Sequence, residues 1–123
     1  MRHPELAGKR VLVVEDEMLV AMLIEDMLAE AGCVVIGPFA RVPEALAAAR
    51  TETVDAALLD VNVAGETVFP VAHVLEERGV SFLFMTGYGT AALPRDRPKW
   101  KACTKPFHPD HLTECLARRL KTA

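Results

Sequence analysis

The most constraining feature of the 123-residue sequence is a set of short, wholly apolar runs that alternate with stretches of helical periodicity. Such runs, bounded by charged residues or by Gly and Pro, indicate strands that are buried on both faces. Strands are expected over residues 11–14, 34–36, 56–60, 82–85 and 102–104, and helices over 17–31, 43–50, 67–78 and 109–121. We therefore expect an α/β fold, in which right-handed crossovers connect a parallel sheet covered by helices on both faces.

One stretch interrupts this alternation, between the fourth and fifth expected strands. Pro94 and Pro98 each remove a backbone donor there and restrict the residue before them. A full helix does not fit, and we expect at most one turn, over residues 90–93. The prolines and the few apolar anchors predict a mobile loop over residues 87–100.

The composition excludes several classes of protein. Half of the residues are apolar (51%), and the net charge is −3, which argues against nucleic-acid binding through a basic surface. No apolar stretch is long enough to span a bilayer, and the first residues lack the apolar core of a secretory signal. The cysteines Cys33, Cys103 and Cys115 are scattered, so we expect small apolar residues rather than a metal pair or a disulfide framework. A single domain in a reducing cytoplasm is predicted.

Polar residues stand directly after four of the five expected strands. In an open parallel sheet, ligands bind outside the carboxyl ends of the strands. The residues found there are Glu15, Asp16 and Glu17 after the first strand, Asp60 and Asn62 at the third, Thr86 at the fourth and Lys105 at the fifth. Each alone is more often a cap, a turn former or a solvated side chain. Their joint placement at one edge favours a functional site.

This set of residues predicts phosphoryl chemistry. Clustered carboxylates repel one another unless a cation lies among them, and oxygen ligands suit Mg²⁺. Asp60 stands alone at the end of a buried strand, and an aspartate can attack a phosphoryl group to form an acyl phosphate. That step needs positive charge and a hydrogen-bond donor beside the transferring oxygens, which Mg²⁺, Lys105 and Thr86 would supply.

The motifs VLVVEDE, LLDVN, MTG and TKPF, in this order, resemble the receiver domain of bacterial two-component response regulators. The resemblance implies a flavodoxin-like (CheY-like) three-layer sandwich, with five parallel strands in the order 2-1-3-4-5. It also implies a single receiver domain over residues 1–123, with its core at about 9–121. The fourth helix is expected to be shortened or disordered.

The resemblance also implies a role for each polar residue at the strand ends. Asp60 is similar to the phosphoacceptor, and Glu15 and Asp16 to the acidic pair at the Mg²⁺ site, with Asp16 the more direct ligand. Asn62 matches the residue whose main-chain carbonyl completes the metal shell. Thr86 and Lys105 match the switch hydroxyl and the lysine before a cis proline.

Departures from the common pattern point to a variant group. Ala102 stands where many receivers carry a switch aromatic, the loop after Asp60 lacks the usual proline, and the fourth helix is cut short. These features resemble the FATGUY receivers, whose partners are often histidine kinases of the HWE or HisKA2 class. We hypothesise that Tyr88 takes over part of the switching role, and that the first helix, with Met18, Leu19 and Met22, is the kinase-docking surface.

The predicted function is a cytoplasmic, single-domain response regulator that accepts a phosphoryl group from a histidine kinase and signals by protein binding, or drains phosphoryl groups. It is not expected to be a turnover enzyme or to bind nucleic acid or membranes. Alternatives are a receiver fragment of a larger regulator or hybrid kinase, and a pseudo-receiver that merely binds a partner. A small Mg²⁺-dependent phosphatase and a flavin or nucleotide module fit less well, because VNV follows Asp60 and the loop after the first strand is acidic.

Overall fold

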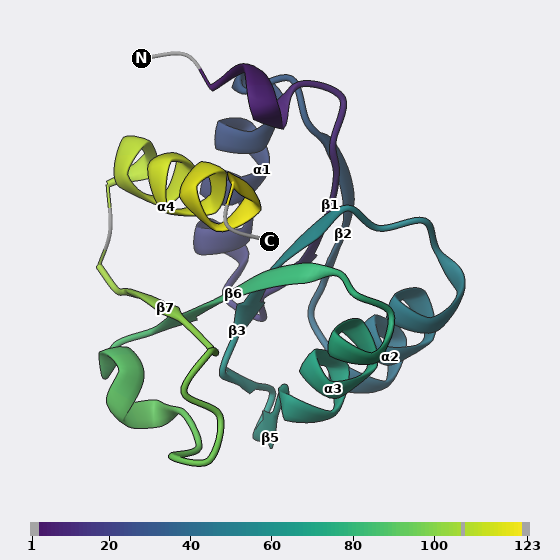
Figure 1. The fold of residues 1–123 in the computed structure, drawn as a ribbon, viewed down its shortest axis with the longest axis vertical. Coiled ribbons are helices and arrows are strands. Elements are labelled where there is room, and N and C mark those ends of the chain that lie inside the picture. Colours follow the sequence, from purple (N-terminus) through teal and green to yellow (C-terminus); the bar gives the residue numbers. More distant parts are fainter. Residues whose placement is uncertain (1–2, 107, 122–123) are drawn as a thin grey trace.

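Strands and helices alternate along the chain as expected, in a computed structural model that describes residues 3–106 and 108–121 (Figure 1). The strands are β1 Arg10–Val14, β2 Val34–Phe39, β3 Ala56–Asp60, β4 Asn62–Val63, β5 Glu66–Thr67, β6 Ser81–Thr86 and β7 Ala102–Thr104. The α-helices are α1 Met18–Glu30, α2 Val42–Thr51, α3 Phe69–Glu77 and α4 Pro109–Lys121, and two short 3₁₀ helices are η1 Pro4–Leu6 and η2 Gly89–Ala92. A proline lies in the first turn of α2, α3 and α4, where its missing N–H has no intrahelical partner to lose.

Five strands form one parallel sheet in the order β2-β1-β3-β6-β7. Because β6 and β7 are the fourth and fifth of these strands along the chain, this is the expected order 2-1-3-4-5. β4 and β5 pair with each other as an antiparallel hairpin after β3, where a plain loop was expected. Its two connecting residues, Ala64 and Gly65, both have positive φ, as tight hairpin turns require.

Helices cover both faces of the sheet and complete three layers. Figure 1 shows α2 and α3 together on one face and α1 and α4 on the other, and each pair is in contact. Strand side chains alternate between these layers. Leu12, Val14, Ala57, Leu59, Phe82 and Phe84 pack in the core on the α2/α3 side, and Val11, Val13, Ala56, Leu58, Leu83, Met85 and Cys103 on the α1/α4 side. No helix among the described residues is long and apolar enough to cross a bilayer.

β2 runs through Gly37 and Pro38, where the sequence predicted its end. Its pairing with β1 shifts register here, as at a bulge, so the strand continues. Gly37 has a φ of 103°, and a Cβ on it would lie 2.8 Å from the Phe39 nitrogen and 3.0 Å from the Val13 carbonyl oxygen. The extension matters for the site, because the N–H of Glu15 donates to the carbonyl of Phe39 at 2.9 Å.

The segment between β6 and β7 contains one 3₁₀ turn, η2, which confirms the shortened fourth helix. The expectation of few apolar anchors is wrong at the far end of this segment, where Leu93 and Trp100 are buried. The Trp100 ring packs against phenylalanines of α3 and β6, and its indole N–H donates to Glu76 at 2.9 Å. Arg97 pairs with the same carboxylate at 2.9 Å. The segment is therefore fixed to α3 just before β7 begins.

Candidate functional site

Glu15, Asp60 and Lys105 come together at the carboxyl edge of the sheet from three different strands. The Lys105 Nζ lies 2.8 Å from Oε1 of Glu15 and 3.5 Å from Oδ2 of Asp60. The Glu15 side chain is fully buried, and those of Asp60 and Lys105 are 11% and 19% exposed. Glu15, expected among the metal ligands, is thus also the nearer partner of the lysine. The Lys105–Pro106 peptide bond is cis.

The alternation of side chains along the strands explains this convergence. Val13, Leu58 and Cys103 all face the α1/α4 layer, and each of the three charged residues lies two positions beyond one of them. Thr86 instead lies two positions beyond Phe84, which faces the α2/α3 layer. The alternation therefore places Thr86 on the other side of the sheet edge from the lysine and the two carboxylates.

Thr86 is buried and bound to the chain around it. Its hydroxyl accepts a hydrogen bond from the N–H of Tyr88 at 3.1 Å, and its carbonyl accepts one from the N–H of Lys105 at 2.8 Å. In the described part of the chain, no hydrogen bond joins the Thr86 hydroxyl to Asp60. That hydroxyl can still donate its own proton, because a threonine oxygen can accept and donate at once.

Asp16 adds a third carboxylate at the exposed side of the site. One oxygen each from Glu15, Asp16 and Asp60 lie within 4.8 Å of one another. Asp16 also accepts a hydrogen bond from the N–H of Ala64 at 2.9 Å, which ties the β4–β5 hairpin to the site. Asn62 is exposed in that hairpin, two residues past Asp60, and within the described ranges no hydrogen bond connects it to the three carboxylates.

Burial and charge set the ionisation of the site. Burial, and then the charge and hydrogen bond of Glu15, raise the pKa of Asp60 to about 7, although Lys105 opposes this. Burial alone would lower the pKa of Lys105, but Glu15 and Asp60 outweigh it and the pKa is raised. The lysine is thus held as a cation, while burial and the charge of Glu15 disfavour the ionised form of Asp60 more than Lys105 favours it.

The residues of the site fit a hard divalent cation. Three carboxylates lie close together and Lys105 contacts two of them, so an additional positive charge lowers their mutual repulsion. Their donors are all oxygen atoms, and Asp16 leaves one side of the cluster open to water, which Mg²⁺ retains when it binds to proteins. We infer from the donor set that Glu15, Asp16 and Asp60 could hold such an ion.

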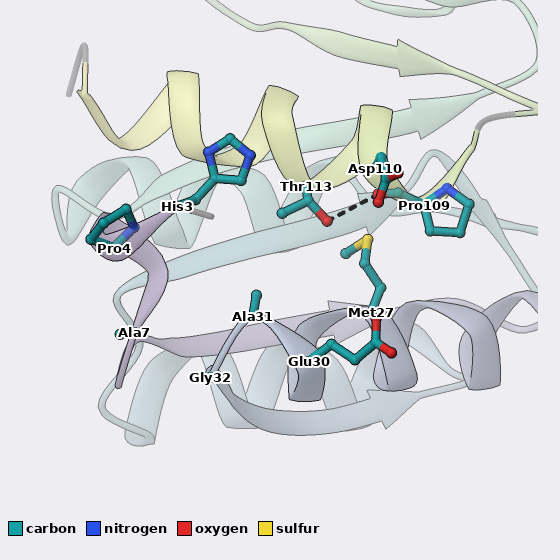
Figure 2. A pocket seen from close by; sticks show the side chains of 10 residues that line it. All are labelled: His3, Pro4, Ala7, Met27, Glu30, Ala31, Gly32, Pro109, Asp110 and Thr113. Carbon is teal, nitrogen blue, oxygen red and sulfur yellow. Dashed lines mark hydrogen bonds between the residues drawn. The ribbon is translucent and has the colours of Figure 1, made fainter. Parts of the chain in front are cut away.

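A cavity of about 670 Å³ lies elsewhere, between η1, α1 and α4 (Figure 2). His3, Glu30, Asp110 and Thr113 are among the residues that line it, and Figure 2 shows Met27 reaching from α1 toward α4. None of the predicted site residues lines this cavity. The acidic site is therefore an open edge of the sheet rather than part of this hollow.

The fold and the site together define a flavodoxin-like domain with an acidic centre at the carboxyl edge of its sheet. The family model of the response regulator receiver domain matches residues 11–117, and the chain belongs to this family.

Solved structures agree with this assignment. The solution structure of SdrG from Sphingomonas melonis Fr1 is similar, with 32% identity and a TM-score of 0.79, over 94% of this chain and 98% of that one. PhyR from Brucella abortus has 27% identity and a TM-score of 0.81, over 97% of this chain but 51% of its own. The receiver domain of the sensor histidine kinase PA1611 from Pseudomonas aeruginosa PAO1, solved with a magnesium ion in its active site cleft, has 26% identity and a TM-score of 0.75, over 94% and 99% of the two chains. No curated protein matches the chain.

Sequence reasoning missed two groupings. The Glu15–Lys105 pair could have been predicted from the alternation of side chains along the expected strands, because residues two positions apart lie on the same face of the sheet. The structure also brings Cys103 together with His111 and Cys115, where scattered cysteines without a metal pair were expected. The four-residue spacing of His111 and Cys115, on one side of a helix, was the available signal.

The raised pKa of Asp60 predicts how stability depends on pH in metal-free buffer. Between its ordinary value of 3.8 and about 7, the folded chain binds this proton more tightly than the unfolded chain, so stability falls as pH rises. Asp60→Asn cannot titrate there. It should be more stable than the parent by an amount on the order of 3 kcal/mol at pH 8, and the difference should shrink toward pH 4. Urea unfolding across this range measures it, and parallel pH profiles for the two proteins would contradict it.

Proposed function

We propose that this chain is a phosphorylation-dependent signalling protein, in which Asp60 accepts a phosphoryl group from a phosphohistidine of a histidine kinase. The observation that carries the proposal is the position of Asp60. It ends a fully buried strand, 3.5 Å from the Lys105 ammonium group, with the carboxylates of Glu15 and Asp16 close by. As a single-domain response regulator, it acts by binding a partner protein in one state or by draining phosphoryl groups.

In the transfer step, a carboxylate oxygen of Asp60 forms a bond to phosphorus while the bond to the histidine nitrogen breaks. The electron pair of that bond leaves with the imidazole, which takes up a proton. Lys105 lies where it can pair with a phosphoryl oxygen, and the Thr86 hydroxyl, once its side chain turns toward Asp60, can donate its proton to another. Mg²⁺, held by Asp16, Asp60 and Glu15 with a contribution from the Asn62 carbonyl, would supply the positive charge that the carboxylates and phosphoryl oxygens lack.

The similar proteins support this proposal. The match covers 98% of SdrG and 94% of this chain, so the two chains are similar in length. The PA1611 receiver domain was solved with a magnesium ion in its active site cleft. The sequence features of FATGUY receivers add the proposal that the partner kinase is of the HWE or HisKA2 class.

Phosphotransfer tests the central proposal. Asp60→Asn should abolish transfer of labelled phosphate from candidate kinases, because the other carboxylate in contact with Lys105, that of Glu15, is fully buried and paired with the lysine at 2.8 Å. Chelation of Mg²⁺ should abolish it as well, and Asp96→Asn, an exposed aspartate far along the chain, should leave it unchanged. Labelling of Asp60→Asn at the rate of the parent would refute the proposal.

We propose that residues 87–92 respond to phosphorylation. The Thr86 hydroxyl holds the N–H of Tyr88, so turning this side chain toward Asp60 removes that bond and releases the start of the segment. Tyr88 is 79% exposed and can meet a partner directly. The far end is fixed by Trp100, so the change should be confined to the first part.

Amide hydrogen exchange with and without beryllofluoride and Mg²⁺ tests this response. Exchange should change at residues 87–92, while the amide of Trp100, which donates to the Arg97 carbonyl, keeps its rate. Equal rates over residues 87–92 in both states would defeat the idea. A Tyr88→Ala chain that relays phosphorylation normally would remove the role of this side chain.

The exposed side of α1 is proposed as the surface that binds the kinase. Met18, Leu19, Met22 and Leu23 are 76%, 81%, 53% and 42% exposed, which is unusual for such large apolar side chains. The helix begins directly after the acidic residues 15–17, so a helix of the kinase laid against it would bring its phosphohistidine toward Asp60.

A charge placed on this surface should slow transfer from the kinase. Leu19→Lys is expected to reduce the rate by about tenfold or more, the size of effect that a central interface residue has. Phosphorylation by a small-molecule donor should be unchanged, because it does not need the surface. Val34→Lys is the matched control. Val34 is 46% exposed and is the first residue of β2, so it lies at the amino ends of the strands, away from the acidic site. If Leu19→Lys and Val34→Lys behave alike, α1 is not the docking surface.

A further inference from the structure

Two cysteines and a histidine converge outside the acidic site, between the edge strand β7 and helix α4. Cys103 lies in the middle of β7, and His111 and Cys115 lie one turn apart on α4. The ligand atoms of all three lie within 4.8 Å of one another. Neither the phosphotransfer chemistry nor the proposed docking surface uses any of them.

The local structure explains why they meet. Leu112 and Leu116 are fully buried and pack α4 against the sheet. Cys115 stands beside this buried stripe and is itself half-buried, while Cys103 points from β7 into the same layer. His111 precedes Cys115 by four residues and so lies on the same side of the helix, where it is exposed. The group therefore runs from a buried thiol at Cys103 to a solvent-facing imidazole.

The spacing matches that of a zinc site. The Cys115 Sγ lies 3.6 Å from Nε2 of His111. A tetrahedral ion with sulfur at about 2.3 Å and imidazole nitrogen at about 2.0–2.1 Å holds those two ligand atoms about 3.6 Å apart, and two sulfurs about 3.8 Å apart. Cys115 and His111 thus need little rearrangement to bind one ion, and the Cys103 sulfur lies within 4.8 Å of both ligand atoms.

The donor set favours a soft cation. Cys103 is only 2% exposed, so a charge on its sulfur would need a cation beside it. Sulfur and imidazole are ligands that suit zinc.

We propose that Cys103, His111 and Cys115 form a three-ligand zinc site, with a water molecule completing the tetrahedron on the exposed side of His111. Binding releases the two thiol protons to solvent and forms two Zn–S bonds and one Zn–N bond. The ion ties the edge strand to the last helix. Because Cys103 is two residues before Lys105 in the chain, zinc also fixes the strand that delivers the lysine to the acidic site.

Zinc titration of the whole reduced chain tests the proposal, in competition with a chromophoric chelator and in excess Mg²⁺ so that the acidic site is not available. One zinc ion should bind per chain. Loss of a residue that only hydrogen-bonds to a metal ligand weakens metal sites by about 10–100-fold, so loss of a ligand itself, in His111→Ala or Cys115→Ser, should weaken binding by about 100-fold or more. His111 is exposed, so its replacement leaves the core intact. Cys33→Ser is the matched control and should bind zinc like the parent.

Cobalt gives an independent readout. Co²⁺ in place of zinc should show a sulfur-to-cobalt charge-transfer band, which should weaken in Cys115→Ser and persist in Cys33→Ser. Equal zinc affinity in the parent and in both His111→Ala and Cys115→Ser would overturn the proposal. So would a cobalt spectrum without sulfur character, or a Cys103–Cys115 disulfide that forms in air in the presence of stoichiometric zinc.

Discussion

The short contact between Lys105 and the buried carboxylate of Glu15 is the interaction on which the site depends. A fully buried carboxylate without a partner is strongly destabilising, so the lysine must reach it for the chain to fold with Glu15 in place. The same ammonium group then stands 3.5 Å from Asp60. One cation thus compensates the carboxylate of Glu15 and also faces that of Asp60, so an added cation would lower the repulsion between the two carboxylates.

Much of the fold and the site could be predicted from the sequence, because both rest on short-range patterns. The wholly apolar runs predicted the parallel sheet. The polar residues that follow these runs predicted the members of the site, because parallel strands all end at the same edge of the sheet. Asp60 and Lys105 were identified in this way and do come together. The order of the strands came from the family resemblance, not from the runs themselves.

The remaining features depend on packing across the chain, which the local pattern does not contain. The prolines predicted a mobile loop over residues 87–100. Instead, Trp100 packs against Phe69 of α3 and Phe84 of β6 and fixes the end of that segment. Gly37 and Pro38 predicted the end of a strand, but a shift in register lets β2 continue. Cys103 and Cys115 are twelve positions apart and meet only because α4 folds back over β7. Such groupings follow from the orientation of one element on another.

The bond between Glu76 and Trp100 closes a ring of contacts around the acidic centre. From Asp60 the chain passes through the β4–β5 hairpin into α3. Glu76 of that helix accepts a hydrogen bond from Trp100, which lies just before β7. Lys105, just after β7, contacts Asp60. η2 lies between β6 and Trp100 and is not part of this ring, so a change of conformation there leaves the contact between Glu76 and Trp100 in place.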